Sequence, residues 1–532
     1  MSELKIDDKP EIEAELNNDS EPVQKDSEKP KKKKGLRGYI IRSTLLGLVF
    51  VLSVTLVAVS HWYKNNYFLE FKDLIYVLTG PIEGTGNSMV NDILAAALPY
   101  TITAAAVYTE IVFLLAKKNK IVKYLRAALC FVCSASLVYS LFFTAYAFRF
   151  DTFGETLGES TTIYEDYYVD PNSVSITANG KTKNLIYIYL ESMEANHTSS
   201  EYGGEHKTNY IPNLTQYALN NVSFSTLGQG TVGGFVPING ATWTMAALLS
   251  TTSGVPFAFS VEGNNVMDKR DKFAPGLTTI GQVLEKKGYK NVFLCGSDAT
   301  FGGRQKYFTQ HGNYEIYDIN DARQGGYIDY FHNGHWGMYD KDLYAMARDR
   351  LTELAKLDQP FNFTMLTVDT HPPEGKGICE LCGDVYEQPT ANTVACADKQ
   401  VSEFVEWIKQ QDFYKDCVIV ISGDHLRMDK GLNDDDNFPR RIYNCYINSD
   451  VAPTGETFNR LFSPLDMFPT TVASLGFEIE GNRLGLGTNL FAGKDAAPTL
   501  VEQMGYETFN GEIAKHSDYY LTTFEYPPED KD

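Results

Sequence analysis

The chain has 532 residues and a formal net charge of −21 at neutral pH. This length exceeds that of a usual single domain, so we expect at least two structural units. The acidic balance argues against nucleic acid as a partner, because proteins that bind it present a basic face to the phosphates.

The N-terminal part of the sequence predicts a tail followed by a membrane region. Residues 1–30 are rich in Asp, Glu, Lys and Pro, which is typical of disorder, and we place a cytoplasmic tail at 1–36. Three apolar runs follow, at about 43–62, 93–116 and 125–148, each long enough to span a bilayer. We therefore predict about three transmembrane helices within 37–150. Pro99 and Glu110 interrupt the second run, and Glu110 either reaches the interface or has a function.

Basic residues predict the orientation of these helices. Lys31 to Lys34 and Arg37 precede the first run, and residues 117–126 between the second and third runs are also basic. Positive charge stays on the cytoplasmic side, so three spans leave everything after about residue 148 outside. We expect a multi-pass protein of the cell membrane with an extracellular domain, and no cleaved signal peptide, because the first run is too long.

Strands alternate with helices in the rest of the chain. A polar linker at 151–182 leads into the main domain at 183–495, and a C-terminal extension occupies 496–532. Helices are expected at 211–221, 277–289, 340–357 and 395–411; the last two carry apolar residues at three- and four-residue spacing. This order predicts an α/β fold with a doubly wound, mostly parallel sheet.

Four apolar strands of this domain each run into polar side chains. NLIYIYLES reaches Glu191, NVFLCGSD reaches Asp298, FTMLTVDTH reaches His371, and CVIVISGDH reaches Asp424 and His425. Ligands of an open α/β sheet bind outside the carboxyl ends of its strands. Two carboxylates and an imidazole suit Mn²⁺, Mg²⁺ or Zn²⁺, so we predict a divalent-metal site, although Glu191 and Asp424 could also cap helices.

A hydroxyl group for nucleophilic chemistry lies between the first two of these strands. In GATWTMAALLSTTSGVPF, Thr244 opens a helix-forming run, where unpaired N–H groups and the helix dipole would hold a phosphate. A metal ion would lower the pKa of such a hydroxyl and make it a nucleophile. Spacing alone also allows Thr242, Thr251 or Thr252, and Thr244 could simply cap the helix.

Three cysteines of the expected extracellular domain lie close together in the sequence. Cys379 and Cys382 form a Cys-x-x-Cys pair, which suggests a redox or zinc site, and Cys396 follows. No further Cys or His pair completes zinc-finger spacing nearby. We therefore favour a disulfide from Cys396 to Cys379 or Cys382, in an oxidising space.

Five motifs, in order, resemble the lipoteichoic acid synthase and phosphoglycerol transferase family of the alkaline phosphatase/sulfatase superfamily. They are NLIYIYLES, TMAALLSTTSGVP, FGGR, DTHPP and SGDH, and the resemblance covers nearly all of 183–495 and part of the membrane region. It implies that the metal is held by Glu191, Thr244, Asp424 and His425. It also implies that Thr244 is the nucleophile, rather than Thr242, Thr251 or Thr252.

The same resemblance suggests two substrate-binding residues. Arg304 of FGGR matches an Arg that contacts the phosphate, for which a planar guanidinium is suited. A surface salt bridge is its alternative role. His371 of DTHPP matches a His near the scissile phosphate that could protonate the leaving group, and its alternative role is a hydrogen bond across a turn.

Departures from the family narrow the expected activity. Cys295 and Gly302 stand where the lipoteichoic acid branch tends to carry His and Trp, and that branch has more than three spans. This chain looks closer to the branch that decorates glycans with phosphoglycerol. Sulfatase activity is disfavoured because the helix begins with Thr244 and lacks the C/S-x-P-S-R pattern.

The resemblance implies a membrane-anchored transferase with a divalent metal, Mn²⁺ first, then Mg²⁺ or Zn²⁺. It would move glycerophosphate from phosphatidylglycerol to a cell-surface glycan or glycolipid, through a covalent phosphothreonine intermediate. Alternatives are a phosphoethanolamine transferase and a phosphodiesterase or sulfatase-type hydrolase. A catalytically silent surface-binding protein is the alternative from another class.

Overall fold

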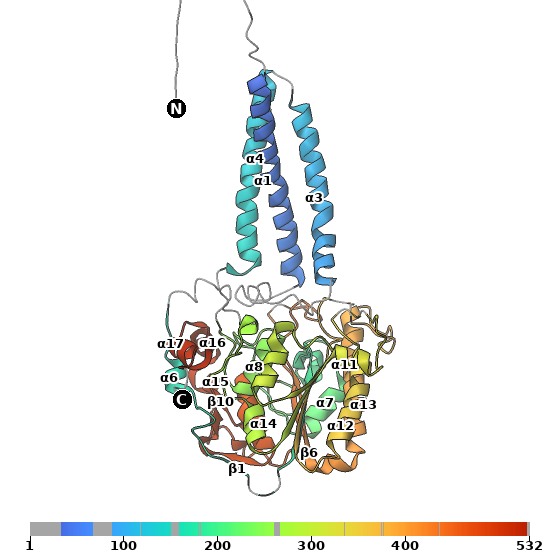
Figure 1. Cartoon of the computed structure of the whole chain (residues 1–532), viewed down its shortest axis with the longest axis vertical. Helices are drawn as coiled ribbons and strands as arrows, with labels where there is room; N and C mark the ends of the chain where they lie inside the picture. The colour runs from blue at the N-terminus through green and yellow to red at the C-terminus, as the bar shows by residue number, and fades with distance from the viewer. Residues whose placement is uncertain are drawn as a thin grey trace, which may run out of the picture.

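The computed structural model describes residues 33–66, 88–116, 119–150 and 159–528, the last range without 179, 181, 260–266, 333, 335, 374, 376 and 436. Most of the predicted tail, residues 1–32, and the first part of the predicted linker, 151–158, lie outside the described residues. Figure 1 shows long helices that stand on one side of an α/β domain.

The three long helices are α1 (Lys33–Asn66), α3 (Ser88–Leu114) and α4 (Lys120–Ala147). Among the described residues, these are the helices long and apolar enough to cross a membrane, and they cover the three predicted spans. Hydroxyl pairs link α1 to its neighbours: Thr55 lies 2.8 Å from Thr101 of α3, and Ser60 lies 2.9 Å from Thr144 of α4. Such small polar side chains let apolar helices approach closely.

A six-stranded sheet forms the centre of the domain. Its strands lie in the order β4 (Glu315–Tyr317), β3 (Lys290–Cys295), β5 (Phe361–Leu366), β2 (Asn184–Leu190), β6 (Cys417–Gly423) and β7 (Asn444–Ile447). All neighbours are parallel except β6 and β7. Every residue of β5 and β6 is buried, as in parallel sheets covered on both faces.

Helices cover both faces of this sheet, because successive side chains of β2 point alternately to two apolar cores. Leu185, Tyr187 and Tyr189 belong to one core, and Ile186, Ile188 and Leu190 belong to the other. The first core includes α8 (Thr244–Ser253), α9 (Ile280–Lys286), α10 (Arg304–Gln310) and α14 (Met467–Ser474). The second includes α7 (Pro212–Asn220), α11 (Ile319–Gln324), α12 (Asp340–Leu354) and α13 (Pro389–Lys409). The predicted doubly wound α/β fold is confirmed.

The segments that the sequence sets apart as linker and C-terminal extension pack on the first core. Tyr164 and Tyr520 are both buried, with ring centroids 5.2 Å apart. The elements involved are α6 (Ile163–Tyr167), β1 (Ile176–Ala178), α15 (Leu500–Met504), α16 (Tyr506–Ala514) and α17 (Asp518–Tyr520). β1 pairs antiparallel with β8 (Phe477–Ile479), and β9 (Arg483–Leu484) pairs with β10 (Gly487–Thr488). Both segments therefore extend the compact domain beyond 183–495.

Candidate active site

The three predicted metal ligands meet past the ends of β2 and β6. Leu190 pairs with Gly423 in the parallel register, so Glu191 and Asp424 leave the sheet side by side. The Nε2 atom of His425 lies 3.5 Å from Glu191 Oε1 and 3.4 Å from Asp424 Oδ2. All three side chains are buried, and one ligand atom from each lies within 4.8 Å of the others. The structure thus brings together three groups that could hold a metal ion.

Thr244 adds a hydroxyl to this group from the first residue of α8. Its Oγ1 lies 3.3 Å from Glu191 Oε2 and 3.3 Å from His425 Nε2. Trp243, the residue before the helix, makes no side-chain capping hydrogen bond to the first-turn N–H groups. Hydroxyl, imidazole and helix N-terminus therefore face one point, where an anion would be favoured.

The competing threonines of the same helix have structural roles. Thr251 is fully buried, and its hydroxyl lies 2.8 Å from the hydroxyl of Tyr189. Thr252 is also buried and lies 2.7 Å from the hydroxyl of Tyr307. Thr242 precedes the helix. The structure therefore places Thr244, rather than Thr251 or Thr252, beside the three candidate ligands.

The electrostatics of the cluster fit a divalent cation. Burial, and next the charge of Asp424, raise the pKa of Glu191 above its ordinary 4.5. Burial opposes protonation of His425, but Asp424 and Glu191 outweigh it and raise the pKa of that imidazole. Asp424 Oδ2 is buried and accepts no hydrogen bond from the part of the chain that the structure describes. Crowded carboxylates with an unsatisfied acceptor are stabilised by a bound cation, so these residues fit a metal.

Several side chains that the sequence did not single out hold Glu191 in place. Ser192 donates its hydroxyl to Glu191 Oε1 at 2.7 Å, and its backbone N–H to Asp424 Oδ1 at 2.8 Å. The φ of Ser192 is 52°, which lies in the left-handed region. This conformation is costly for a residue with a Cβ, and residues that adopt it cluster at functional sites. Thr367 accepts the N–H of Glu191 at 2.9 Å, and Thr370 donates to its carbonyl. Their positions directly after β2 and β5 were the signal available in the sequence.

A buried ion-pair network supports the loops behind the cluster. Arg440 Nε donates to Glu194 Oε2 at 2.9 Å, and the backbone N–H of Arg427 donates to Glu194 Oε1 at 3.0 Å. The guanidinium of Arg427 binds Asp429 and the carbonyl of Thr370. These bonds join the loop after β6 to the loop after β5. No motif in the sequence indicated this network.

His371 lies at the same edge of the sheet, beyond β5. Its Nδ1 is 2.6 Å from the carbonyl oxygen of Pro372, and its ring packs against Trp336 with centroids 4.2 Å apart. Trp336 in turn donates Nε1–H to the same carbonyl at 3.3 Å. His371 opposes in part the rise in the pKa of Glu191 that burial and Asp424 cause. The structure thus places His371 near the cluster, on a support that the sequence did not reveal.

Arg304 is the first residue of α10 and is buried, so it is not the surface ion pair considered as its alternative. Its Nη2 donates to the carbonyl of Asp298 at 2.6 Å and its Nε to that of Phe301 at 3.0 Å. A Cβ at Gly302 would lie 3.3 Å from the ring of Trp243, so this loop packs beside the start of α8. Asp298 binds Thr300 of its own turn and is not one of the clustered ligands.

The part of the chain that holds this cluster is similar to a known protein family. Residues 183–442 match the protein-family model described as Sulfatase. The match covers just under half of the chain, and it confirms the resemblance to the alkaline phosphatase/sulfatase superfamily.

Two curated relatives carry the name phosphoglycerol transferase I. Phosphoglycerol transferase I of Xanthomonas euvesicatoria pv. vesicatoria is 29% identical over 326 residues, which cover 60% of this chain and 44% of the relative. The protein of that name from Escherichia fergusonii is 26% identical over 476 residues, which cover 86% of this chain and 57% of the relative. The chain spans about half the length of the curated relatives it matches.

Two solved structures are also similar. Lipoteichoic acid synthase LtaP from Listeria monocytogenes is 21% identical, with a TM-score of 0.43, over 60% of this chain and 79% of that chain. Lipooligosaccharide phosphoethanolamine transferase A from Neisseria meningitidis is 14% identical, with a TM-score of 0.46, over 83% of this chain and 86% of that chain.

Proposed function

We propose that this protein is a membrane-anchored, metal-dependent transferase. It moves glycerophosphate from phosphatidylglycerol to a hydroxyl of a cell-surface glycan or glycolipid. The observation that carries the proposal is the position of Thr244 Oγ1, 3.3 Å from both Glu191 and His425 at the start of α8. The relatives named phosphoglycerol transferase I support glycerophosphate as the transferred group.

Thr244 is the nucleophile of the first step. A divalent metal held by Glu191, Asp424 and His425 would lower the pKa of its hydroxyl and balance the charge of the phosphate. The bond from Thr244 Oγ to phosphorus forms, and the bond from phosphorus to the diacylglycerol oxygen breaks. The hydroxyl proton of Thr244 leaves to solvent, and His371 gives a proton to the departing diacylglycerol.

The second step reverses these roles on the acceptor. The acceptor hydroxyl gives its proton to His371 and attacks the phosphorus, which frees Thr244 to regain a proton from solvent. First-turn N–H groups of α8 hold the phosphate oxygens through both steps. Arg304 is a further phosphate ligand in this proposal, because its loop packs against Trp243, the residue directly before the nucleophile.

The helices α1, α3 and α4 serve as the anchor. A lipid donor stays in the plane of the head groups, so a tethered domain meets it more often than a free one would. The basic residues before the first span and between the second and third spans support an extracellular position for the domain. Thr244 at the start of the helix, where sulfatases need Cys or Ser, disfavours sulfate-ester hydrolysis.

The proposal is tested with the full-length protein in lipid vesicles. Vesicles carry phosphatidylglycerol labelled in its terminal glycerol, and a surface-glycan extract supplies the acceptor. We expect Thr244→Ala to abolish transfer, Thr244→Ser to keep part of it, and Thr352→Ala, on an exposed face of α12, to leave it unchanged. Transfer that persists in Thr244→Ala would contradict the mechanism. Transfer only from vesicles of labelled phosphatidylethanolamine would show that this lipid, and not phosphatidylglycerol, is the donor.

A further inference from the structure

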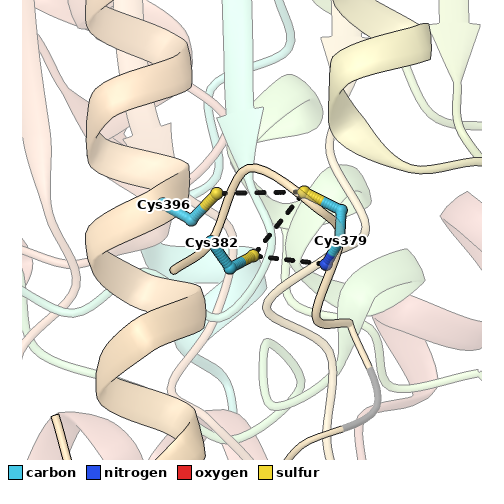
Figure 2. Close-up of side chains that lie close together, drawn as sticks. All are labelled: Cys379, Cys382 and Cys396. Carbon is cyan, nitrogen blue, oxygen red and sulfur yellow. Dashed lines mark hydrogen bonds between the residues drawn. The ribbon is translucent and has the colours of Figure 1, made fainter. Parts of the chain in front are cut away.

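Three thiol groups that belong to neither the carboxylate cluster nor its support converge beside α13. Cys379 and Cys382 lie on the loop before the helix, and Cys396 lies on the helix itself (Figure 2). The Sγ atom of Cys379 is 3.6 Å from that of Cys382 and 3.9 Å from that of Cys396. All three are buried, and all three are free thiols. The structure therefore differs from the disulfide that the sequence favoured.

The spacing of the sulfur atoms matches the geometry of a metal site. Zinc binds thiolates at about 2.3 Å in a tetrahedron, which sets neighbouring sulfurs about 3.8 Å apart. The two distances, 3.6 and 3.9 Å, lie on either side of this value, and all three sulfurs lie within 4.8 Å of one another. A disulfide would use two of the three thiols and leave the third over, whereas one metal ion uses all of them.

We propose that Cys379, Cys382 and Cys396 form a second metal site, which takes a thiophilic ion such as Zn²⁺. Soft thiolate ligands select zinc, whereas the oxygen-rich cluster at the sheet edge suits harder ions, so the two sites discriminate between metals. Three protein ligands that leave the fourth tetrahedral position open are a known arrangement for zinc.

Hydrogen-bond donors around the sulfurs support this assignment. The side-chain amide of Gln400 donates Nε2–H to Cys396 Sγ at 3.2 Å, and the backbone N–H of Cys379 donates to Cys382 Sγ at 3.3 Å. Such bonds orient thiolates and stabilise their charge in metal sites. Gln400 lies one turn after Cys396 on α13, so the helix supplies both a ligand and its supporting donor.

The site would fasten the loop that follows His371 to α13. A Cβ at Gly377 would lie 1.6 Å from the carbonyl oxygen of Asp369, so just before Cys379 the loop runs tightly against the segment that follows β5. Between Pro372 and Pro389 the described residues form turns rather than helix or strand. A metal bound to both the loop and the helix therefore restricts the loop that carries His371.

Metal analysis of the full-length protein in detergent tests the proposal. Asp424→Asn weakens the sheet-edge site, and in that background we expect one zinc per chain, which a thiol-blocking reagent releases. Adding Cys396→Ser should remove this zinc, whereas Cys130→Ser, at an exposed thiol of α4, should not. Zinc bound equally with and without Cys396 would overturn the proposal.

Two further measurements use the wild-type protein, so their outcome does not depend on whether a variant folds. Wild-type protein loaded with Co²⁺ should show thiolate-to-cobalt charge-transfer absorption, and its absence would contradict a thiolate site. Non-reducing peptide mapping should show three thiols that zinc protects from alkylation. A disulfide among the three cysteines, or three thiols that alkylate equally with and without zinc, would refute the proposal.

Discussion

The substitution Asp424→Asn should stabilise the protein when no divalent cation is bound and should make it less stable than wild type when one is bound. The clustered oxygens of Glu191 and Asp424 lie within 4.8 Å of each other. At an effective dielectric constant of about 20, two such charges repel by about 3.5 kcal/mol. His425 offsets part of this repulsion. An Asn at this position still accepts the two N–H groups that Asp424 Oδ1 accepts, each at 2.8 Å, but it carries no charge. In chelator, Asp424→Asn should therefore raise the free energy of unfolding by about 1–3 kcal/mol.

The order should reverse when the cation is present. A ligand at one thousand times its Kd stabilises the native state by about 4.1 kcal/mol, which exceeds the difference expected in chelator, and Asp424→Asn lacks one of three ligands needed for that gain. Thermal unfolding of the full-length protein in detergent, followed by tryptophan fluorescence with EDTA and with Mn²⁺, measures both states. Asp358→Asn, the same change at an exposed position, serves as the control. Equal stabilisation of wild type and Asp424→Asn by the cation would refute the reasoning.

Three further predictions concern the groups around the site. Ser192→Ala removes the hydroxyl bond to Glu191 and should weaken metal-dependent transfer about 10–100-fold; an unchanged metal titration of activity would contradict this. Burial raises the pKa of Asp398 from 3.8 to about 6, so wild type should lose stability as pH rises from about 4 to about 7, and Asp398→Asn should lose less; equal pH dependence of the two melting temperatures would refute this. Arg440→Ala leaves Glu194 buried and unpaired, which should cost about 3–5 kcal/mol, and an unchanged melting temperature would count against it.

The sequence predicted the sheet and the residues at its edge because both follow from local patterns. Apolar runs identify β2 and β6, and parallel strands deliver their last residues to one edge, so Glu191 and Asp424 could be paired in advance. Helix 395–411 was predicted too short, since α13 begins at Pro389. The added turn, PTANTV, has no clear helical periodicity, although Pro at the start of a helix is favourable.

The rest depends on contacts between distant residues, which periodicity does not encode. The pair of Glu194 and Arg440 joins positions 246 residues apart. The choice of Thr244 over Thr251 needed either the family resemblance or the burial of Thr251 in the folded domain. The arrangement of the three cysteines likewise depends on how the loop at 377–388 returns to α13.

The central claim is tested most directly by the mass of a covalent adduct. Full-length protein is incubated with phosphatidylglycerol and a divalent cation in the absence of an acceptor, quenched in acid, digested and analysed by tandem mass spectrometry. The proposed mechanism predicts a glycerophosphate group on Thr244, which disappears when an acceptor is added. Glycerophosphate attached to another residue, with Thr244 unmodified, would contradict it.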